Sequence, residues 1–161
     1  MRRVTLLLCA SLAFILTSCL GPGGGLSRNW SRVYEATFTT TDATDAVVYS
    51  KEDYRVRIDI LDITKEQMNI TFPNFRLTES DSPLTLLFEN VPYTITYSED
   101  GRSQKYVFDV KSAIPHIEDV DSADYEVESL QGELSGKENI TIRFAMKRKP
   151  YKVEFTDQPK Q

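Results

Sequence analysis

The sequence predicts an all-β protein: a single antiparallel up-and-down β-barrel of about eight strands, following a cleaved signal peptide. Apolar and polar residues alternate with a period of two in short segments that recur roughly every ten residues. Turn-forming residues separate these segments, and none of them shows a helical period. Nearly every segment has one apolar face, so the sheet must close on itself or pack on a second layer. An open β-sandwich is the alternative.

The N-terminus has the pattern of a secretory signal. Arg2 and Arg3 precede an uncharged, mostly apolar run over 4–16, and small residues follow at 17–18. This run is too short for the ~20 residues that a spanning helix needs, so we expect cleavage after residue 18.

The end of this run, Leu16-Thr17-Ser18-Cys19, resembles the lipobox of bacterial lipoproteins, in which the cysteine is acylated. Two or three acyl chains on Cys19 would anchor the protein stably. An ordinary signal peptide with an incidental cysteine is the alternative. Residues 19–30 are expected to form a lipidated, Gly-rich tether. The predicted location is the cell envelope at the outer membrane, facing either the periplasm or the surface, because no acidic cluster follows Cys19.

Length and charge limit the function classes. Residues 31–157 form one predicted domain with a single core, followed by a polar tail at 158–161. The formal net charge is −5, and loss of two arginines with the signal makes it −7, which argues against nucleic acid or an anionic lipid surface as partner. Cys9 leaves with the signal and Cys19 takes lipid, so no internal disulfide is expected. One histidine is too few for a zinc site, and we expect no cofactor.

The first half of the domain contains four or five predicted strands. The alternation is clearest over 54–60, where apolar residues alternate with Arg55, Arg57 and Asp59. Other segments lie at 30–40, at 68–72 with a continuation at 75–77 beyond a Pro-Asn interruption, and at 84–88, with a short edge piece at 47–49.

The second half repeats the pattern. Predicted strands lie at 93–97, 106–110, 125–134, 140–146 and 151–155. Asp100-Gly101 separates the first two, which is a strong hairpin signal because such turns need positive φ. The longest polar connection covers 111–124.

Alternation also predicts which side chains line the barrel. An eight-stranded barrel is either filled by side chains or just wide enough for one small ligand. Core packing is the default for the tyrosines, although a Tyr-lined interior suits a ligand. The candidate lining residues are Tyr34, Phe38, Val56, Ile58, Tyr93, Ile95, Phe108, Ile142 and Phe144.

Four segments are similar to the calycin-like β-barrel lipoproteins of Bacteroidetes, a lipocalin-related group. They are 70–77 (Ile-Thr-Phe-Pro-Asn-Phe-Arg-Leu), 86–91 (Leu-Leu-Phe-Glu-Asn-Val), 130–135 followed by 140–144, and 151–155 (Tyr-Lys-Val-Glu-Phe). The resemblance covers roughly residues 33–156, implies an eight-stranded barrel and carries no activity. The chain departs from the lipocalins proper because Trp30 is not part of a Gly-x-Trp motif, which argues against a lipocalin-type ligand site.

No segment has the pattern of a catalytic or metal site. His116, in the long connection, has no nucleophile or partner at a suitable spacing, and we interpret it as structural or solvent-exposed. The acidic stretch 118–124 could hold calcium, but Ala123 and Asp124 occupy positions where a calcium loop needs other residues. A solvated loop is therefore the favoured interpretation.

Three short motifs match glycan-acceptor patterns. Asp121-Ser122-Ala123 resembles the O-glycan acceptor of Bacteroidetes, so Ser122 is a candidate acceptor. Asn69 and Asn139 match the N-glycan pattern, but both fall in or beside strands and are interpreted as strand residues.

Three function hypotheses follow. The first is a lipid-anchored, non-catalytic binding or scaffold module for a small apolar ligand or a protein. The second is a surface interaction or inhibitor domain with a packed interior and no ligand. The third is a hydrolase, for which the sequence offers only His116 and the 118–124 carboxylates.

Overall fold

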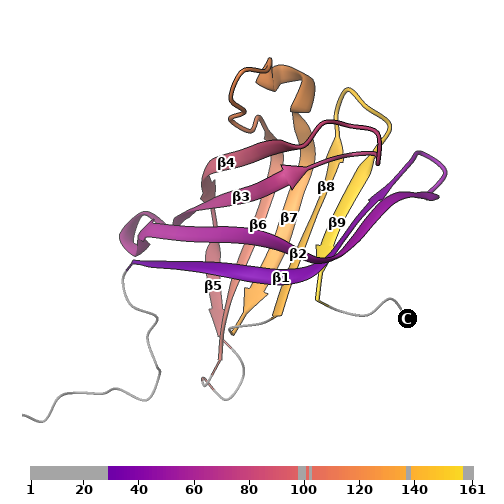
Figure 1. Ribbon diagram of the computed structural model, residues 1–161. Helices are drawn as coiled ribbons and strands as arrows, with labels where there is room; N and C mark the ends of the chain where they lie inside the picture. The colour runs from indigo at the N-terminus through magenta and orange to yellow at the C-terminus, as the bar shows by residue number, and fades with distance from the viewer. Residues whose placement is uncertain (1–28, 98–100, 102, 137–138, 158–161) are drawn as a thin grey trace, which may run out of the picture.

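The computed structural model describes residues 29–97, 101, 103–136 and 139–157, and it confirms the all-β, antiparallel meander (Figure 1). The described elements are β1 (Trp30–Thr41), β2 (Val47–Asp62), η1 (Ile63–Lys65), β3 (Gln67–Phe75), β4 (Leu84–Pro92), β5 (Thr94–Tyr97), β6 (Gln104–Ala113), η2 (Ser122–Tyr125), β7 (Val127–Ser135), β8 (Asn139–Met146) and β9 (Lys152–Thr156). The signal segment, Cys19 and the polar tail lie outside the described residues.

The strands form one sheet that rolls into a nearly closed barrel, so the sandwich alternative is wrong. The strand order is β4-β3-β2-β1-β9-β8-β7-β6-β5, in which the first and last strands of the chain are paired neighbours. All the neighbouring pairs are antiparallel. Trp30, expected at the end of the tether, is the first residue of β1.

The two ends of this sheet order, β4 and β5, are consecutive in the chain and together form one bent stretch over 84–97. Its first part pairs with β3 and its last part with β6. Beside β4, the main chains of Leu87 and His116 exchange hydrogen bonds of 3.0 and 2.7 Å, which partly close the seam. Tyr93 N donates to Glu66 O on the β3 side, so Pro92 N faces the seam, where a proline costs no ladder bond. Counting 84–97 as one strand gives the eight that the sequence predicts.

The β1–β2 hairpin is longer than the sequence pattern indicates. The expected edge piece at 47–49 is the beginning of β2, and Thr41 pairs with Val47 across the turn. The Asp42 carboxylate accepts hydrogen bonds from Thr44 N and Oγ1 and from Ala46 N, which fixes the turn. These bonds hold the pKa of Asp42 below its usual value.

The core is dominated by aromatic rings. Phe72, on β3, is fully buried and contacts the rings of Tyr54, Phe75, Phe88, Phe144 and Phe155 at centroid distances between 5.7 and 6.5 Å. The Tyr54 hydroxyl, also buried, donates to Pro73 O at 2.6 Å. The centre of the barrel is therefore filled by interlocking rings.

The nine candidate lining residues all belong to this core or border it. Eight are buried, and Ile95 is partly buried against the others. Gly132 on β7 makes room for one of them, because a Cβ at that position would collide with the Phe108 ring and with Thr141 O.

Candidate functional site

The outer face of β6, β7, β8, β9 and β1 carries a hollow that we call the outer groove. It consists of two depressions of about 470 and 300 Å³ that share Gln131 and Arg143. Its polar lining includes Asp109, Gln131, Glu133, Thr141, Arg143 and Glu154.

Register places the central side chains of the groove in one row across five strands. Asp109 pairs with Gln131, Gln131 with Arg143, Arg143 with Glu154, and Glu154 with Thr39. Cross-strand neighbours on one face lie close enough to interact directly. The row therefore forms a continuous strip of donors and acceptors perpendicular to the strands.

Two interactions hold this strip in place. Gln131 Nε2 donates to Asp109 Oδ1 at 3.2 Å, and Arg143 forms a salt bridge with Glu154 whose shortest N–O distance is 2.7 Å. The Arg143 and Gln131 side chains are otherwise exposed to solvent. Each keeps hydrogen-bonding capacity that faces outward, since a guanidinium has five donors and an amide has both donors and an acceptor.

A bulge in β7 lies at one side of the groove. The β7–β8 register shifts between Glu128 and Gln131, and Ser129, at the bulge, has a φ of 53°. Bulges increase local twist and redirect side chains. Thr39 is only 4% exposed although it faces away from the interior, which indicates how far the outer face is hollowed here.

Of the sequence-derived candidates, only the barrel-lining residues Phe108 and Phe144 border the outer groove, and none of the candidates for catalysis, metal binding or modification does. His116 is exposed and uses its main chain to bridge Leu87. It lines a separate outer depression of about 440 Å³ together with Glu118 and Asp119. Asp121 caps η2 through Ala123 N.

Ser122 lies at the start of η2 and is half-buried. Its hydroxyl oxygen accepts a hydrogen bond from Ile117 N at 3.2 Å. Asn69 in β3 accepts one from Asn90 N, and Asn139 is exposed at the start of β8. Glycosylation of Ser122 stays a prediction.

Within the described ranges, no three His, Cys, Asp or Glu side chains gather into a group that could hold a metal ion. Among those same residues, no helix is both long and apolar enough to cross a membrane. No family model matches the chain, and no curated protein or solved structure is significantly similar to it.

Sequence reasoning missed Gln131 and Arg143 as site residues because each is simply a polar residue in an alternating strand. The signal that joins them is the pairing register, which brings Asp109, Gln131, Arg143 and Glu154 into one row. The register of these three strand pairs depends on the lengths of their connections and on the β7 bulge. This register, and with it the row of side chains, cannot be inferred from a single sequence.

Proposed function

We propose that this chain is a lipid-anchored, non-catalytic protein of a bacterial cell envelope that recognises a protein partner through the outer groove. The proposed anchor is acylated Cys19, and the proposed family is the calycin-like β-barrel lipoproteins. The observation that carries the proposal is the contrast between an interior filled by aromatic rings and an outer face with a hollow polar row. It favours the packed interaction domain over a carrier of an apolar ligand.

The chemistry of the groove favours an extended polar segment as the recognised element. Gln131 and Glu133 offer acceptors, while Arg143 offers a planar set of donors suited to carboxylates and main-chain carbonyls. Sixteen residues line the two depressions, fewer than the roughly 20–30 per partner of a stable interface. We therefore expect transient binding of a short stretch of the partner.

Site-specific photo-crosslinking in the native host tests this proposal. A crosslinking side chain at Gln131 should give one discrete protein adduct, and the same side chain at Arg57, exposed on β2, should not. Adding Arg143→Ala should reduce the Gln131 adduct at least fivefold. Equal adducts at both positions, or an adduct insensitive to Arg143, would contradict the groove assignment.

Two further measurements test the remaining parts. Native mass spectrometry of protein extracted from its host should detect no bound small molecule, and an apolar ligand released on unfolding would restore the carrier hypothesis. Labelled fatty acid should attach to the wild-type chain and not to Cys19→Ala. Labelling that persists without the thiol would remove the anchor.

A further inference from the structure

An arginine occupies an inward-facing position at one end of the barrel. Along β1, residues Trp30, Arg32 and Tyr34 share a face, and their partners on β2 are the fully buried Ile60, Ile58 and Val56. Their outward neighbour Val33 is 56% exposed. The usual order of apolar inside and charged outside is therefore reversed at Arg32 and Val33. Partly burying a guanidinium costs free energy unless it is paired, so this reversal needs an explanation.

Arg32 lies against aromatic rings instead of a carboxylate. Its guanidinium carbon is 5.3 Å from the centroid of Trp30 and 5.9 Å from that of Tyr34. Nη1 donates to Gly136 O at 2.8 Å. Four other described arginines, Arg55, Arg57, Arg143 and Arg148, form salt bridges with acidic side chains, whereas Arg32 forms none with any described residue.

Two more polar groups lie beside Arg32 and make no hydrogen bond of good geometry with a described residue, although the Trp30 N–H is close enough to the Tyr106 hydroxyl to lower its pKa. They are Trp30 Nε1 and the Tyr106 hydroxyl, whose residue is only 3% exposed. The rings of Trp30 and Tyr106 meet edge to face at 5.8 Å. Buried indole and phenol groups usually find a partner, so two orphans in one place are unusual.

Burial and nearby positive charge act in opposite directions on the two phenols of this place. Burial raises the pKa of Tyr106, while the Trp30 N–H and the positive charge of Arg32 act to lower it. For Tyr34, burial raises the pKa and Arg32 again opposes the rise. No carboxylate of a described residue acts on either phenol.

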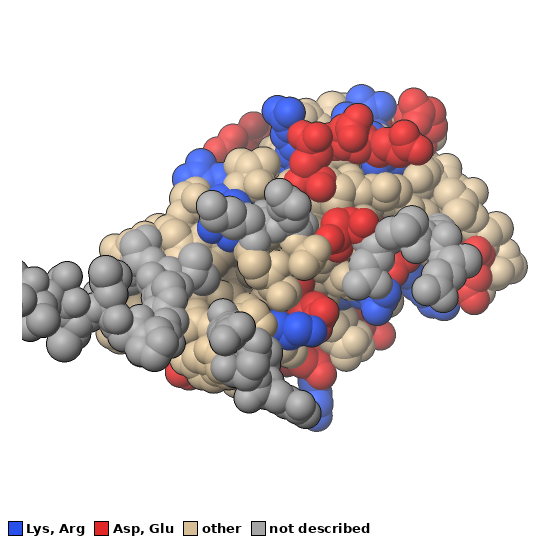
Figure 2. All heavy atoms as spheres, turned by 90° about the horizontal axis from the view of Figure 1, so that it is seen from below, with Lys and Arg blue, Asp and Glu red and all other residues tan. Residues whose placement is uncertain are grey.

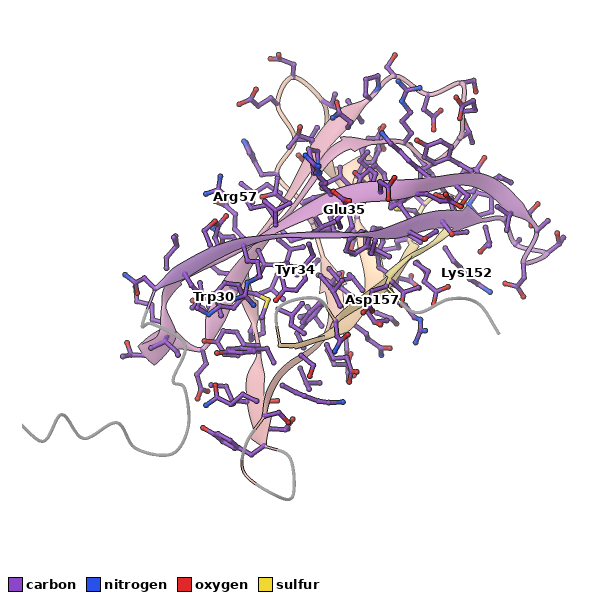
Figure 3. The ribbon with its side chains drawn as sticks, turned by 60° about the horizontal axis from the view of Figure 1, so that its bottom comes forward. Trp30, Tyr34, Glu35, Arg57, Lys152 and Asp157 are labelled. Atoms are coloured by element: carbon purple, nitrogen blue, oxygen red, sulfur yellow. The ribbon has the colours of Figure 1, made fainter. Side chains whose placement is uncertain are left out.

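We propose that Trp30, Arg32 and Tyr106, the lower cluster, bind an anionic oxygen group, either a carboxylate or a phosphate. Arg32 and Trp30 are half-buried, so the cluster borders solvent, and the guanidinium has further donors besides the one that binds Gly136 O. The core behind is packed with rings, so only the head group enters. Figure 3 shows Trp30 and Tyr34 side by side beneath β1, far from Lys152.

The acidic side chains are not spread evenly over the described surface: seen from below, their largest group lies at the upper edge of the view (Figure 2). Trp30 also lies eleven residues after Cys19, a stretch that reaches at most about 40 Å. In the anchored protein, the head group could therefore come from solution or from the membrane.

Trp30 is the single tryptophan of the chain, so its fluorescence reports on this cluster. We would titrate the full mature chain carrying Cys19→Ser with benzoate and with glycerol phosphate, using benzamide as the uncharged control. Saturable change in Trp30 emission with at least one anion, and none with benzamide, is expected. The proposal would be overturned if Trp30 emission did not change at anion concentrations up to about 10-fold above the dissociation constants of weak anion sites. An equal change in emission with benzamide would also overturn it.

Three variants locate the effect. Arg32→Gln should weaken binding at least tenfold, and Tyr106→Phe, which removes only an orphan hydroxyl, should weaken it about threefold. Arg76→Gln is the matched control, because Arg76 donates to the main-chain carbonyl of Glu79, outside the cluster, and its replacement should change binding less than twofold. Circular dichroism confirms that each variant is folded. Unchanged affinity in both folded cluster variants would overturn the assignment.

Vesicles distinguish the two sources of the head group. Acylated protein bound to phosphatidylglycerol vesicles, but not to phosphatidylcholine vesicles, should show the same Trp30 change if the membrane supplies the anion. A response only to the dissolved anions assigns a free ligand. Neither result depends on Gln131 or Arg143, so failure here leaves the outer groove untouched, and failure of the groove leaves the lower cluster untouched.

Discussion

The centre of the barrel and its lower end are built by the same strand, β1, and follow opposite rules. At the centre, Phe38 stacks on Tyr54 at 4.7 Å, and the Tyr54 hydroxyl has a carbonyl partner. At the lower end, Arg32 points inward and the Tyr106 hydroxyl has no partner within the described part of the chain. The centre is thus arranged for stability, and the lower end carries costs that stability alone does not explain.

The largest expected effect is at the centre. Phe72→Ala removes the ring that contacts five others and should lower the free energy of unfolding by about 3–5 kcal/mol, from lost burial and an unfilled cavity. Urea unfolding followed by circular dichroism measures it. Val33→Ala, on the exposed side of β1, should change the same quantity by less than about 0.5 kcal/mol. A loss below about 1 kcal/mol for Phe72→Ala would mean that the centre is loosely packed.

An added methyl group should also be costly where the barrel wall is closed. Gly132→Ala places a Cβ against the Phe108 ring and Thr141 O, and we expect a loss of about 1–3 kcal/mol in the same assay. Adding Phe108→Leu should recover only part of it, because the main-chain oxygen cannot move away as a ring can. Full recovery would show that the ring alone sets the constraint.

Two tyrosines give the most direct comparison of the regions. Tyr54→Phe leaves Pro73 O without its donor and should cost about 1–2 kcal/mol, whereas Tyr106→Phe removes an unpaired hydroxyl and should cost less than about 0.5 kcal/mol. Both folded-state pKa values are raised by burial. Their contribution is present below pH 10 and is lost as pH rises above it. Equal losses in the two variants would mean that Tyr106 has a partner after all.

The smallest expected effect lies outside both regions. Lys147 Nζ, 2.6 Å from Glu126, and Ser112 hold the pKa of that carboxyl below its usual 4.5. A depressed folded-state pKa stabilises the protein above pH 4.5, and this stabilisation is lost as pH falls through the folded-state value. Glu126→Gln should therefore slightly reduce the fall in the free energy of unfolding at acidic pH. At pH 8 the variant should differ from the wild type only by the loss of the Lys147–Glu126 salt bridge. A steeper acid limb in the variant would contradict this assignment.

Alternation in the sequence was enough to predict the architecture. Segments such as 54–60 and 140–146 have unambiguous faces, and the described strands β2 and β8 bury the expected residues. The bounds were harder. Extension of β3 through Pro73 and Asn74 depends on a bulge with a positive φ at Asn74, which period-two reading treats as an interruption.

The sites were not predictable in the same way, for two different physical reasons. The outer groove depends on register across strands far apart in the chain. The lower cluster begins with an arginine that is in phase with the predicted lining residues Tyr34 and Phe38, and its pairing with Ile58 places it on the inner face. Alternation gives the face of Arg32, but which side chains from other strands lie beside it depends on long-range pairing.

The bent stretch over 84–97 has a mechanical consequence. Because it supplies both margins of the sheet, a peptide bond near Tyr93 joins the two sides of the seam where ladder bonds are sparse. The two edges of the sheet are thus connected covalently by the continuous backbone of this stretch. Hydrolysis of that peptide bond would allow the sheet to open along the seam. The burial of Tyr93 protects the bond from proteases.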